Sequence, residues 1–304
     1  MTALAAQSRL LPSAAVAVSA VLWGLYWLPM RYLEAGGIAK AWPSLVLNIV
    51  VFAILMPGLV RRRGSVARHF GSLLFSGLAA GGALALYGIS LNLTDVVRSV
   101  LLFYMMPIWG TVIGLIWLGE RLTSQRVAAL VLGVAGMLIV LRADEGLPLP
   151  RNVGDWMALV SGIAWAVGSA RIFLAKEIGT YETASFFALG AAVITGAGIL
   201  FLPVDVMGPA PTAAAIEASI PIIAASVLLL MIPILFLTVW GTQRLPPATV
   251  GLLLLAEIVV AVGSAAILIE DEPFGVREIL GTVLIAGAGV VEILPARSAK
   301  RNTP

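Results

Sequence analysis

The chain consists of long apolar runs separated by short polar breaks. A membrane-spanning helix needs about 20 mostly apolar residues, and ten runs approach that length. We predict ten spans, at residues 13–31, 42–60, 70–91, 95–118, 124–141, 154–174, 182–202, 219–243, 247–269 and 275–294. Most connections between them are short, and the longest, residues 203–218, is rich in proline and alanine.

Composition excludes an ordinary soluble domain. The 304 residues are 60% hydrophobic and only 12% charged, so polar side chains are too few to cover a water-facing surface. The apolar excess must face lipid, which predicts an all-α polytopic membrane protein. The N-terminal run has features of a signal peptide, but it continues to Arg31, which is long enough to span.

Several classes of chemistry lack the residues that they need. Cysteine is absent, which excludes disulfides and thiolate ligands. The single histidine, His69, follows Arg68 in a polar loop, where a solvated or headgroup-facing role fits better than metal binding. We therefore expect no metal and no cofactor. We also expect no nucleic-acid partner, because the basic residues lie in the connections between spans.

The distribution of basic residues predicts the orientation. With the N-terminus in the cytoplasm, the cytoplasmic connections carry about two thirds of the 19 Lys and Arg residues, including Arg61, Arg62 and Arg63. An even number of spans then places the C-terminus on the same side. Both termini are predicted to be cytoplasmic.

The sequence repeats itself weakly. The stretch VSAVLWGLYWLPMRYL from Val18 aligns with VSGIAWAVGSARIFL from Val160, and a later block places Glu120 on Glu272. We therefore predict a five-helix repeat in residues 1–146 and a second in 147–304. Because five is odd, the second repeat starts from the opposite side of the membrane. Inverted repeats are typical of secondary transporters, whose binding site lies near the bilayer midplane between the repeats.

The chain resembles the drug/metabolite transporter superfamily, in its EamA-like ten-helix group. The resemblance rests on LWGLYWLPMRY, on ISLNLTDVVRSVLLFYMMPIWGTVIGLIWLGERLT and on QRLPPATVGLLLLAEIVVAVGSAAILIEDEPF. Within the family, FYMMP is most similar to bacterial exporters of aromatic amino acids, which often carry a tryptophan where this chain has Met106. The resemblance implies a bacterial inner-membrane protein that works by alternating access.

Pro107 lies in the middle of the fourth span. Tyr104, Pro107, Thr111 and Gly114 follow one helical face, and Pro107 leaves the Phe103 carbonyl without its usual donor. Such a carbonyl is costly in lipid, so this face is expected to line a cavity and to accept a hydrogen bond from a solute ammonium. The alternative is a packing kink that neighbouring helices compensate.

A second proline and two tryptophans extend this hypothesis. We predict Pro107 and Pro233 to be hinges. Trp165 lies near mid-bilayer on a face with Ser161 and Ser169, and Trp23 occupies the equivalent place in the first span. The predicted substrate-binding residues are Trp23, Tyr87, Tyr104, Met106, Pro107, Trp165, Ser169 and Glu257.

Charged residues inside the predicted membrane region are few. Glu257 lies ten residues into span nine, where two roles remain open: proton coupling or ammonium recognition, and a structural hydrogen bond to a neighbouring helix. Arg98 is a candidate for a substrate carboxylate, or extends to the headgroups. Glu120 and Glu272 are expected to make helix-end contacts.

Small residues predict the closest helix packing. Gly133 and Gly136 in span five, and Gly281, Gly287 and Gly289 in span ten, mark packing faces that serve as a scaffold or as a dimer surface. A monomer or a weak homodimer is therefore expected.

We expect an exporter of small amphipathic solutes, namely amino acids with aromatic and other hydrophobic side chains. Whether export is coupled to an ion or is uncoupled facilitation stays open. A proton-coupled multidrug or metabolite efflux pump is the alternative. A polytopic membrane enzyme is disfavoured, since the chain has no HExxH, GxSxG or DxxD constellation. We therefore expect no catalytic residues.

Overall fold

The computed structural model describes residues 2–141, 149–268 and 275–294, and these are helical with short connections and no strand. Eight helical segments in this part are long and apolar enough to cross a membrane, which confirms the all-α polytopic fold class. They are Arg9–Ala35, Trp42–Arg61, Arg63–Ser90, Val96–Trp117, Val153–Leu174, Thr180–Phe201, Ala213–Thr242 and Pro247–Leu268.

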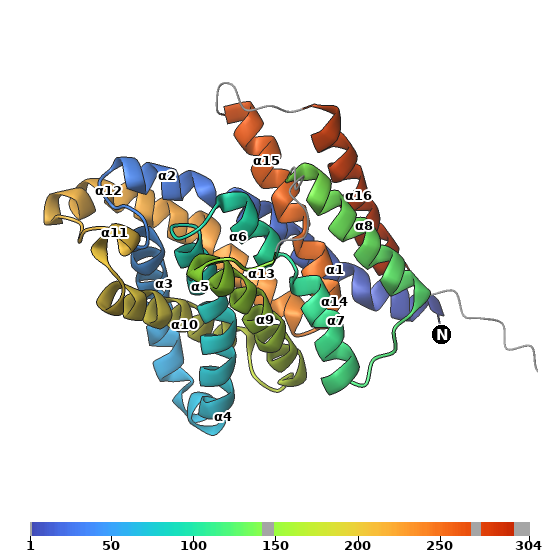
Figure 1. The fold of residues 1–304 in the computed structure, drawn as a ribbon. Helices are drawn as coiled ribbons and strands as arrows, with labels where there is room; N and C mark the ends of the chain where they lie inside the picture. The colour runs from blue at the N-terminus through green and yellow to red at the C-terminus, as the bar shows by residue number, and fades with distance from the viewer. Residues whose placement is uncertain (1, 142–148, 269–274, 295–304) are drawn as a thin grey trace, which may run out of the picture.

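The first half of the chain contains eight α-helices and one π-helical turn, η1 (Figure 1). They are α1 (Thr2–Gly24), α2 (Trp27–Ala35), α3 (Trp42–Arg61), α4 (Arg63–Ser76), η1 (Gly77–Gly81), α5 (Gly82–Ser90), α6 (Val96–Phe103), α7 (Met106–Trp117) and α8 (Ser124–Val140). The second half contains α9 (Val153–Leu174), α10 (Thr180–Phe201), α11 (Val204–Met207), α12 (Ala213–Ser226), η2 (Val227–Met231), α13 (Ile232–Thr242), α14 (Pro247–Leu254), α15 (Ala256–Leu268) and α16 (Val276–Ile293).

The two remaining predicted spans are α8 and α16, which pack side by side at one edge of the molecule (Figure 1). Their contact is close because both carry glycine: a Cβ added to Gly136 would lie 2.7 Å from the Gly281 carbonyl oxygen, and the converse distance is also 2.7 Å. Helix α8 has 17 residues, and α16 carries Arg277, Glu278 and Glu292. A count of ten spans therefore stays a prediction, and the structure is consistent with it if α8 and α16 also cross the membrane.

Equivalent irregularities occur in the two halves. The third predicted span contains the π-helical turn η1, and the eighth contains η2, 150 residues later. The fourth span breaks between α6 and α7, and the ninth breaks at Leu255 between α14 and α15. This correspondence is consistent with two repeats, and their inversion remains a prediction. The proposed boundary between residues 146 and 147 lies outside the described residues.

Hydrogen-bonding side chains begin several helices where the sequence places Asp, Asn or Thr. The Asp95 side chain accepts from the Arg98 backbone N–H at the start of α6, and Thr123 and Asn152 do the same for α8 and α9. Each satisfies a backbone donor that has no partner within its helix. The caps at Asp95 and Asn152 fix the starts of α6 and α9, two helices that border the site.

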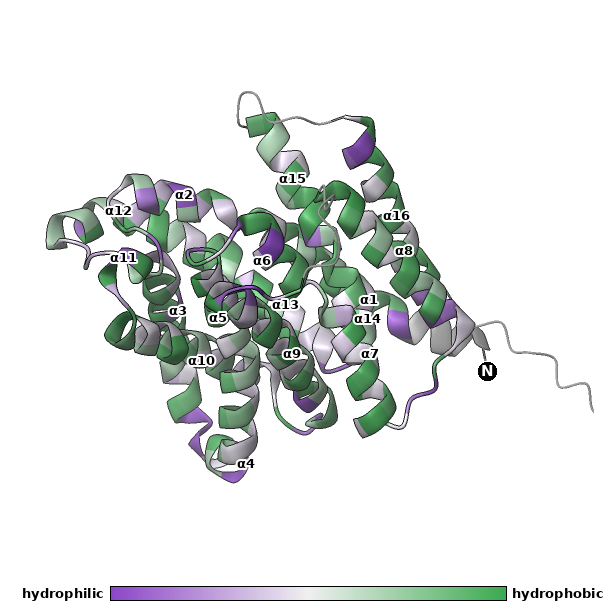
Figure 2. Cartoon of the chain, in the orientation of Figure 1, coloured by the Kyte–Doolittle hydropathy of each residue, from purple (hydrophilic) through white to green (hydrophobic). Residues whose placement is uncertain are grey.

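The outer surface of the helices is apolar. Ile116, Phe201 and Ile267 are 76%, 84% and 83% exposed, and Figure 2 shows hydrophobic residues over most of the helical surface, with hydrophilic residues mainly at helix ends and connections. Water would not tolerate so much apolar surface, so these faces suit a hydrocarbon environment.

Candidate functional site

A cavity of about 380 Å³ lies between the two halves of the chain. Both halves contribute to its wall: α1, α2, α3, α5, α6 and α7 from the first, and α9, α10, α14 and α15 from the second. The volume falls in the lower part of the range of about 300–1,000 Å³ that is usual for small-molecule sites.

The cavity is open at one end and closed at the other. Glu34, Lys40 and Asn92 line the open end and are exposed, and all three belong to the side that the basic-residue pattern places outside. Met106 and Trp165 lie deep and are 1% and 7% exposed. The cavity therefore narrows from a polar mouth to a buried floor.

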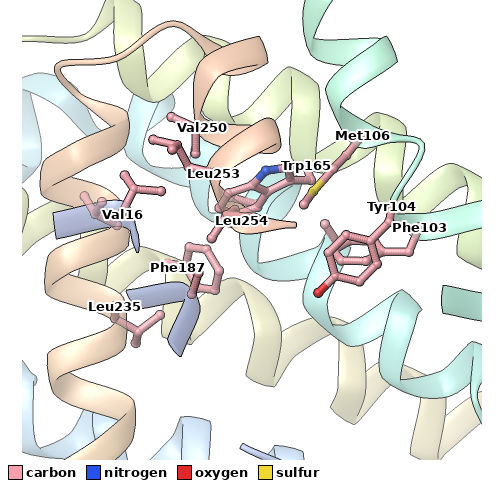
Figure 3. Close-up of a cluster of buried hydrophobic side chains, with 14 of the residues drawn as sticks. Val16, Phe103, Tyr104, Met106, Trp165, Phe187, Leu235, Val250, Leu253 and Leu254 are labelled. Carbon is pink, nitrogen blue, oxygen red and sulfur yellow. The ribbon is translucent and has the colours of Figure 1, made fainter. Parts of the chain in front are cut away.

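Aromatic rings form much of the wall. Tyr87 stacks on Phe103 with 4.4 Å between ring centroids, Trp23 meets Tyr26 edge-on at 5.4 Å, and Trp165 meets Phe187 at 6.1 Å. Figure 3 shows the side chains of Phe103, Tyr104, Met106 and Trp165 projecting toward a common region of the core. The aromatic lining residues are Trp23, Tyr26, Trp27, Tyr87, Phe103, Trp165 and Phe187. Stacked and edge-on rings hold one another in place, which gives the cavity a stiff, apolar outline.

Glu257 brings an ionisable group to this apolar wall. It is the second residue of α15, directly after the break at Leu255. Its side chain is partly accessible from the cavity and lies close to the hydroxyl groups of Tyr104 and Tyr87. A carboxylate among apolar groups is costly unless it is paired or solvated, and the cavity is where a partner of opposite charge would reach it.

Five of the eight predicted site residues line the cavity: Trp23, Tyr87, Met106, Trp165 and Glu257. Tyr104 lies directly behind the wall, 2% exposed, with its hydroxyl near Glu257.

Pro107 and Ser169 lie away from the cavity wall. Pro107 packs against α14, where a Cβ on Gly251 would lie 3.0 Å from the Pro107 Cα. The Phe103 carbonyl oxygen faces α9, only 2.6 Å from where a Cβ on Gly162 would lie. The Ser169 hydroxyl donates to the Ala166 carbonyl of its own helix at 3.0 Å. In this structure the carbonyl and Pro107 therefore face neighbouring helices, because glycines on those helices let α6 and α7 pack closely there. Contact of Pro107 and Ser169 with a solute stays a prediction.

Arg98 takes neither of its expected roles. Its guanidinium pairs with the fully buried Asp155 at 2.5 Å and donates to the Leu149 carbonyl at 2.7 Å. Asp155 also accepts from Thr94 at 2.6 Å. Arg98 thus joins α6 to the start of α9. Glu120 makes the helix-end contact that was expected, with Arg126 at 3.0 Å, and Glu272 lies outside the described residues.

Some lining residues gave little signal in the sequence. Phe187 and Thr195 lie on α10, and Tyr26 lies at the break between α1 and α2. The polar atoms Tyr26 Oη, Trp165 Nε1 and Thr195 Oγ1 are buried, and none has a hydrogen-bond partner in the described part of the chain, although the Ser44 hydroxyl lies near Tyr26. Such orphaned groups are unusual in a closed core and suit a wall that meets a ligand. The described residues contain no group of three His, Asp or Glu side chains that would hold a metal ion.

Hydrogen bonds at the closed end of the cavity join the connection between α13 and α14 to the region between α9 and α10. The Gln243 amide donates to the Ile178 carbonyl at 2.9 Å and accepts from Thr180 at 2.7 Å. Nearby, the Tyr181 hydroxyl donates to the Leu55 carbonyl at 2.6 Å, and Arg62 lies 3.4 Å from Glu182. The last two contacts join the first half of the chain to the second.

Three comparisons relate this fold and cavity to known proteins. Residues 11–142 match the EamA-like transporter family. "Uncharacterized transporter YoaV" from Bacillus subtilis (strain 168) is 25% identical over 158 residues, which cover 49% of this chain and 52% of that protein, so the match spans about half the length of its curated relative. A solved structure described as "Crystal structure of protein" has a TM-score of 0.74 and 19% identity, covering 97% of this chain and all of that one, and it supports the fold alone. Through residues 11–142, which are less than half of its length, the chain is similar to the EamA-like transporter family, and this match supports the resemblance to the drug/metabolite transporter superfamily.

Proposed function

We propose that this protein exports small amphipathic solutes, amino acids with aromatic and other hydrophobic side chains, across the bacterial inner membrane. The observation that carries the proposal is the cavity of about 380 Å³, which joins an aromatic wall to a single deep carboxyl group, Glu257. The volume suits a small solute, the rings suit an apolar side chain, and Glu257 suits an ammonium group. The match of residues 11–142 to a transporter family supports movement of the solute rather than its chemical conversion.

Alternating access is the mechanism that we propose. Equivalent segments of the two halves differ in their contacts. In the first half, residues 40–41 and 91–92 border the open mouth. In the second half, the corresponding segments are closed by the hydrogen bonds of Gln243 to Ile178 and Thr180. Exchanging these two arrangements would close the outer mouth and open the cytoplasmic one.

A proton-coupled efflux pump is the second candidate, and Glu257 is the observation that favours it. A carboxyl group between Tyr104 and Tyr87 can alternate between binding a proton and binding a solute. Facilitated export needs no such exchange. The two candidates predict different responses to a pH gradient.

Transport by the purified protein in liposomes tests the proposal. We expect labelled tryptophan, phenylalanine and leucine to enter protein-containing vesicles faster than empty ones, and glutamate to enter at the rate of empty vesicles. Accumulation above the external concentration only under an imposed pH gradient would identify the coupled pump, and equilibration without it would identify the facilitator. If none of the amino acids moves faster than in empty vesicles, the amino-acid proposal is wrong.

The proposed orientation has a separate test. Short epitope tags on either terminus should be reached by antibodies in inside-out vesicles and protected in intact spheroplasts. Exposure of the two tags on opposite sides would contradict both the even span count and the inverted repeats.

A further inference from the structure

We propose that the cavity selects its solutes by their ammonium group and makes no charged contact with a carboxylate. Its solutes would then be apolar and aromatic amines as a class, with amino acids admitted through their free amine. This inference rests on the proposed function and specifies which part of the solute the same cavity recognises.

The first step concerns Glu257. Its carboxyl group is accessible from the cavity and lies beside the Tyr104 hydroxyl. A carboxylate has about four lone-pair sites, so a neighbouring hydroxyl leaves others free for a solute. An ammonium group that enters the cavity would form a charge-assisted hydrogen bond there, and the apolar surroundings would strengthen it.

The second step concerns the cations that a carboxylate would need. Arg98, which the sequence offers for that purpose, is turned toward the buried Asp155 and the Leu149 carbonyl and is not among the lining residues. Lys40 lines the exposed mouth, and its ammonium donates to the Asp205 carbonyl. Among the lining residues that the structure describes, no other Lys or Arg occurs. The deep part of the cavity therefore carries a negative group without a positive counterpart.

The third step concerns the neutral part of the wall. Seven aromatic rings line the cavity, and the face of an aromatic ring attracts a cation but not an anion. The unpartnered Trp165 Nε1 and the Thr195 hydroxyl are neutral donors. They suit the carbonyl oxygen of an ester or amide as well as that of an acid, so they give a carboxylate no electrostatic advantage. A carboxylate would also be repelled by Glu257.

A set of four indole compounds separates these contributions. Tryptamine and tryptophan methyl ester carry the amine alone, tryptophan carries both charges, and indole-3-propionate carries the carboxylate alone. Binding to the purified wild-type protein is measured by isothermal titration calorimetry near neutral pH. We expect tryptamine and the ester to bind at least as tightly as tryptophan, and indole-3-propionate about tenfold or more weakly, which is the usual worth of a charge-assisted hydrogen bond.

Variants of Glu257 assign the effect to this residue. Glu257→Gln should weaken tryptamine binding about tenfold or more and leave indole-3-propionate unchanged or tighter. Glu257→Asp, which keeps the charge, should retain the preference for amines. Glu217→Gln changes an exposed glutamate on α12 outside the cavity and serves as the control. Thermal unfolding of each variant shows whether it is folded.

The wild-type measurement keeps the inference falsifiable even if a variant does not fold. Equal binding of indole-3-propionate and tryptamine would overturn it, as would tryptamine binding that is unchanged in a folded Glu257→Gln variant. Selective amine binding without any transport would support the inference and overturn the proposed function. Transport of tryptophan that indole-3-propionate and tryptamine inhibit equally would support the proposed function and overturn the inference.

Discussion

Trp165 joins the cavity to the core of the second half. One side of its ring meets the cavity and the other meets Phe187 at 6.1 Å between centroids. Figure 3 shows the ring between Met106 and Leu254. A tryptophan near a membrane surface usually anchors the protein at the interface, but this one is 7% exposed and its indole N–H has no partner among the described residues. The ring therefore has two tasks, packing and shaping the site.

Truncating this ring should impair transport. Trp165→Ala removes one side of the aromatic wall, so we expect tryptophan uptake in liposomes to fall about tenfold, the worth of one good aromatic contact. The milder Trp165→Phe should retain more of the rate. Trp156→Ala removes a tryptophan of the same helix that is 57% exposed and outside the cavity, and it should transport normally. Wild-type uptake by a folded Trp165→Ala protein would remove Trp165 from the site.

The residue types at mid-depth could be predicted from the sequence, but the direction of each side chain could not. Trp165, Tyr87 and Glu257 are unusual in the middle of apolar runs, and that rarity indicated them. Pro107 is equally unusual but faces α14, because Gly251 opens a close contact there, and the Ser169 hydroxyl is bound to the Ala166 carbonyl of its own helix. Arg98 and Asp155 are 57 residues apart in the sequence and lie on different helices. The sequence around either residue does not show that these two helices meet, so their pairing could not be predicted.

The π-helical turns are the most informative elements. Turn η1 packs on α10 through glycine, and a Cβ on Gly81 would collide with the Phe187 carbonyl oxygen. Turn η2 directly precedes Pro233, whose ring cannot continue a regular hydrogen-bond ladder. Two different sequences thus give the same irregularity at equivalent places. Turns of this kind often occur at functional sites.

Enlarging the glycine at η1 tests this packing. Gly81→Val would force α5 and α10 apart, and overpacking of this kind costs about 1–3 kcal/mol or more, so the midpoint of thermal unfolding in detergent should fall clearly. Gly71→Ala is the matched control, since no atom lies within 4 Å of its added Cβ, and it should be neutral or slightly stabilising. Equal unfolding midpoints for wild type and Gly81→Val would show that the contact is looser than described.

The two prolines next to helix breaks are proposed hinges. Pro107 follows the break at Tyr104 and Met105, and Pro233 follows η2. Restoring a backbone donor by Pro107→Ala or Pro233→Ala should stiffen the helix and slow turnover, while solute affinity stays unchanged because neither ring lines the cavity. Pro57→Ala alters a lipid-facing proline inside α3 and should leave turnover as it is. Normal turnover in both hinge variants would assign these prolines to packing alone.

At the scale of the whole molecule, hydropathy alone predicted the helical class and the eight longest spans. The apolar runs are long, and a chain in lipid must satisfy its backbone within helices. The breaks within spans and the position of the cavity could not be predicted in this way, since both depend on which helix faces meet. Spans five and ten are α8, which is short, and α16, which carries three charged residues, and they pair with each other at the edge (Figure 1).

The central claim is that opening one end of the cavity closes the other, and the accessibility of a single cysteine tests it most directly. The natural chain has no cysteine. Gly88 lines the cavity near its mouth with no atom within 4 Å of an added Cβ, so Gly88→Cys should react with a membrane-impermeant maleimide applied to right-side-out vesicles. Adding Gln243→Ala removes both hydrogen bonds of this side chain at the closed end, which we propose to be cytoplasmic, each bond being worth about 1 kcal/mol. We predict that labelling from outside slows several-fold, because the population shifts toward the inward-open state. An unchanged labelling rate would show that the two ends open independently, which contradicts alternating access.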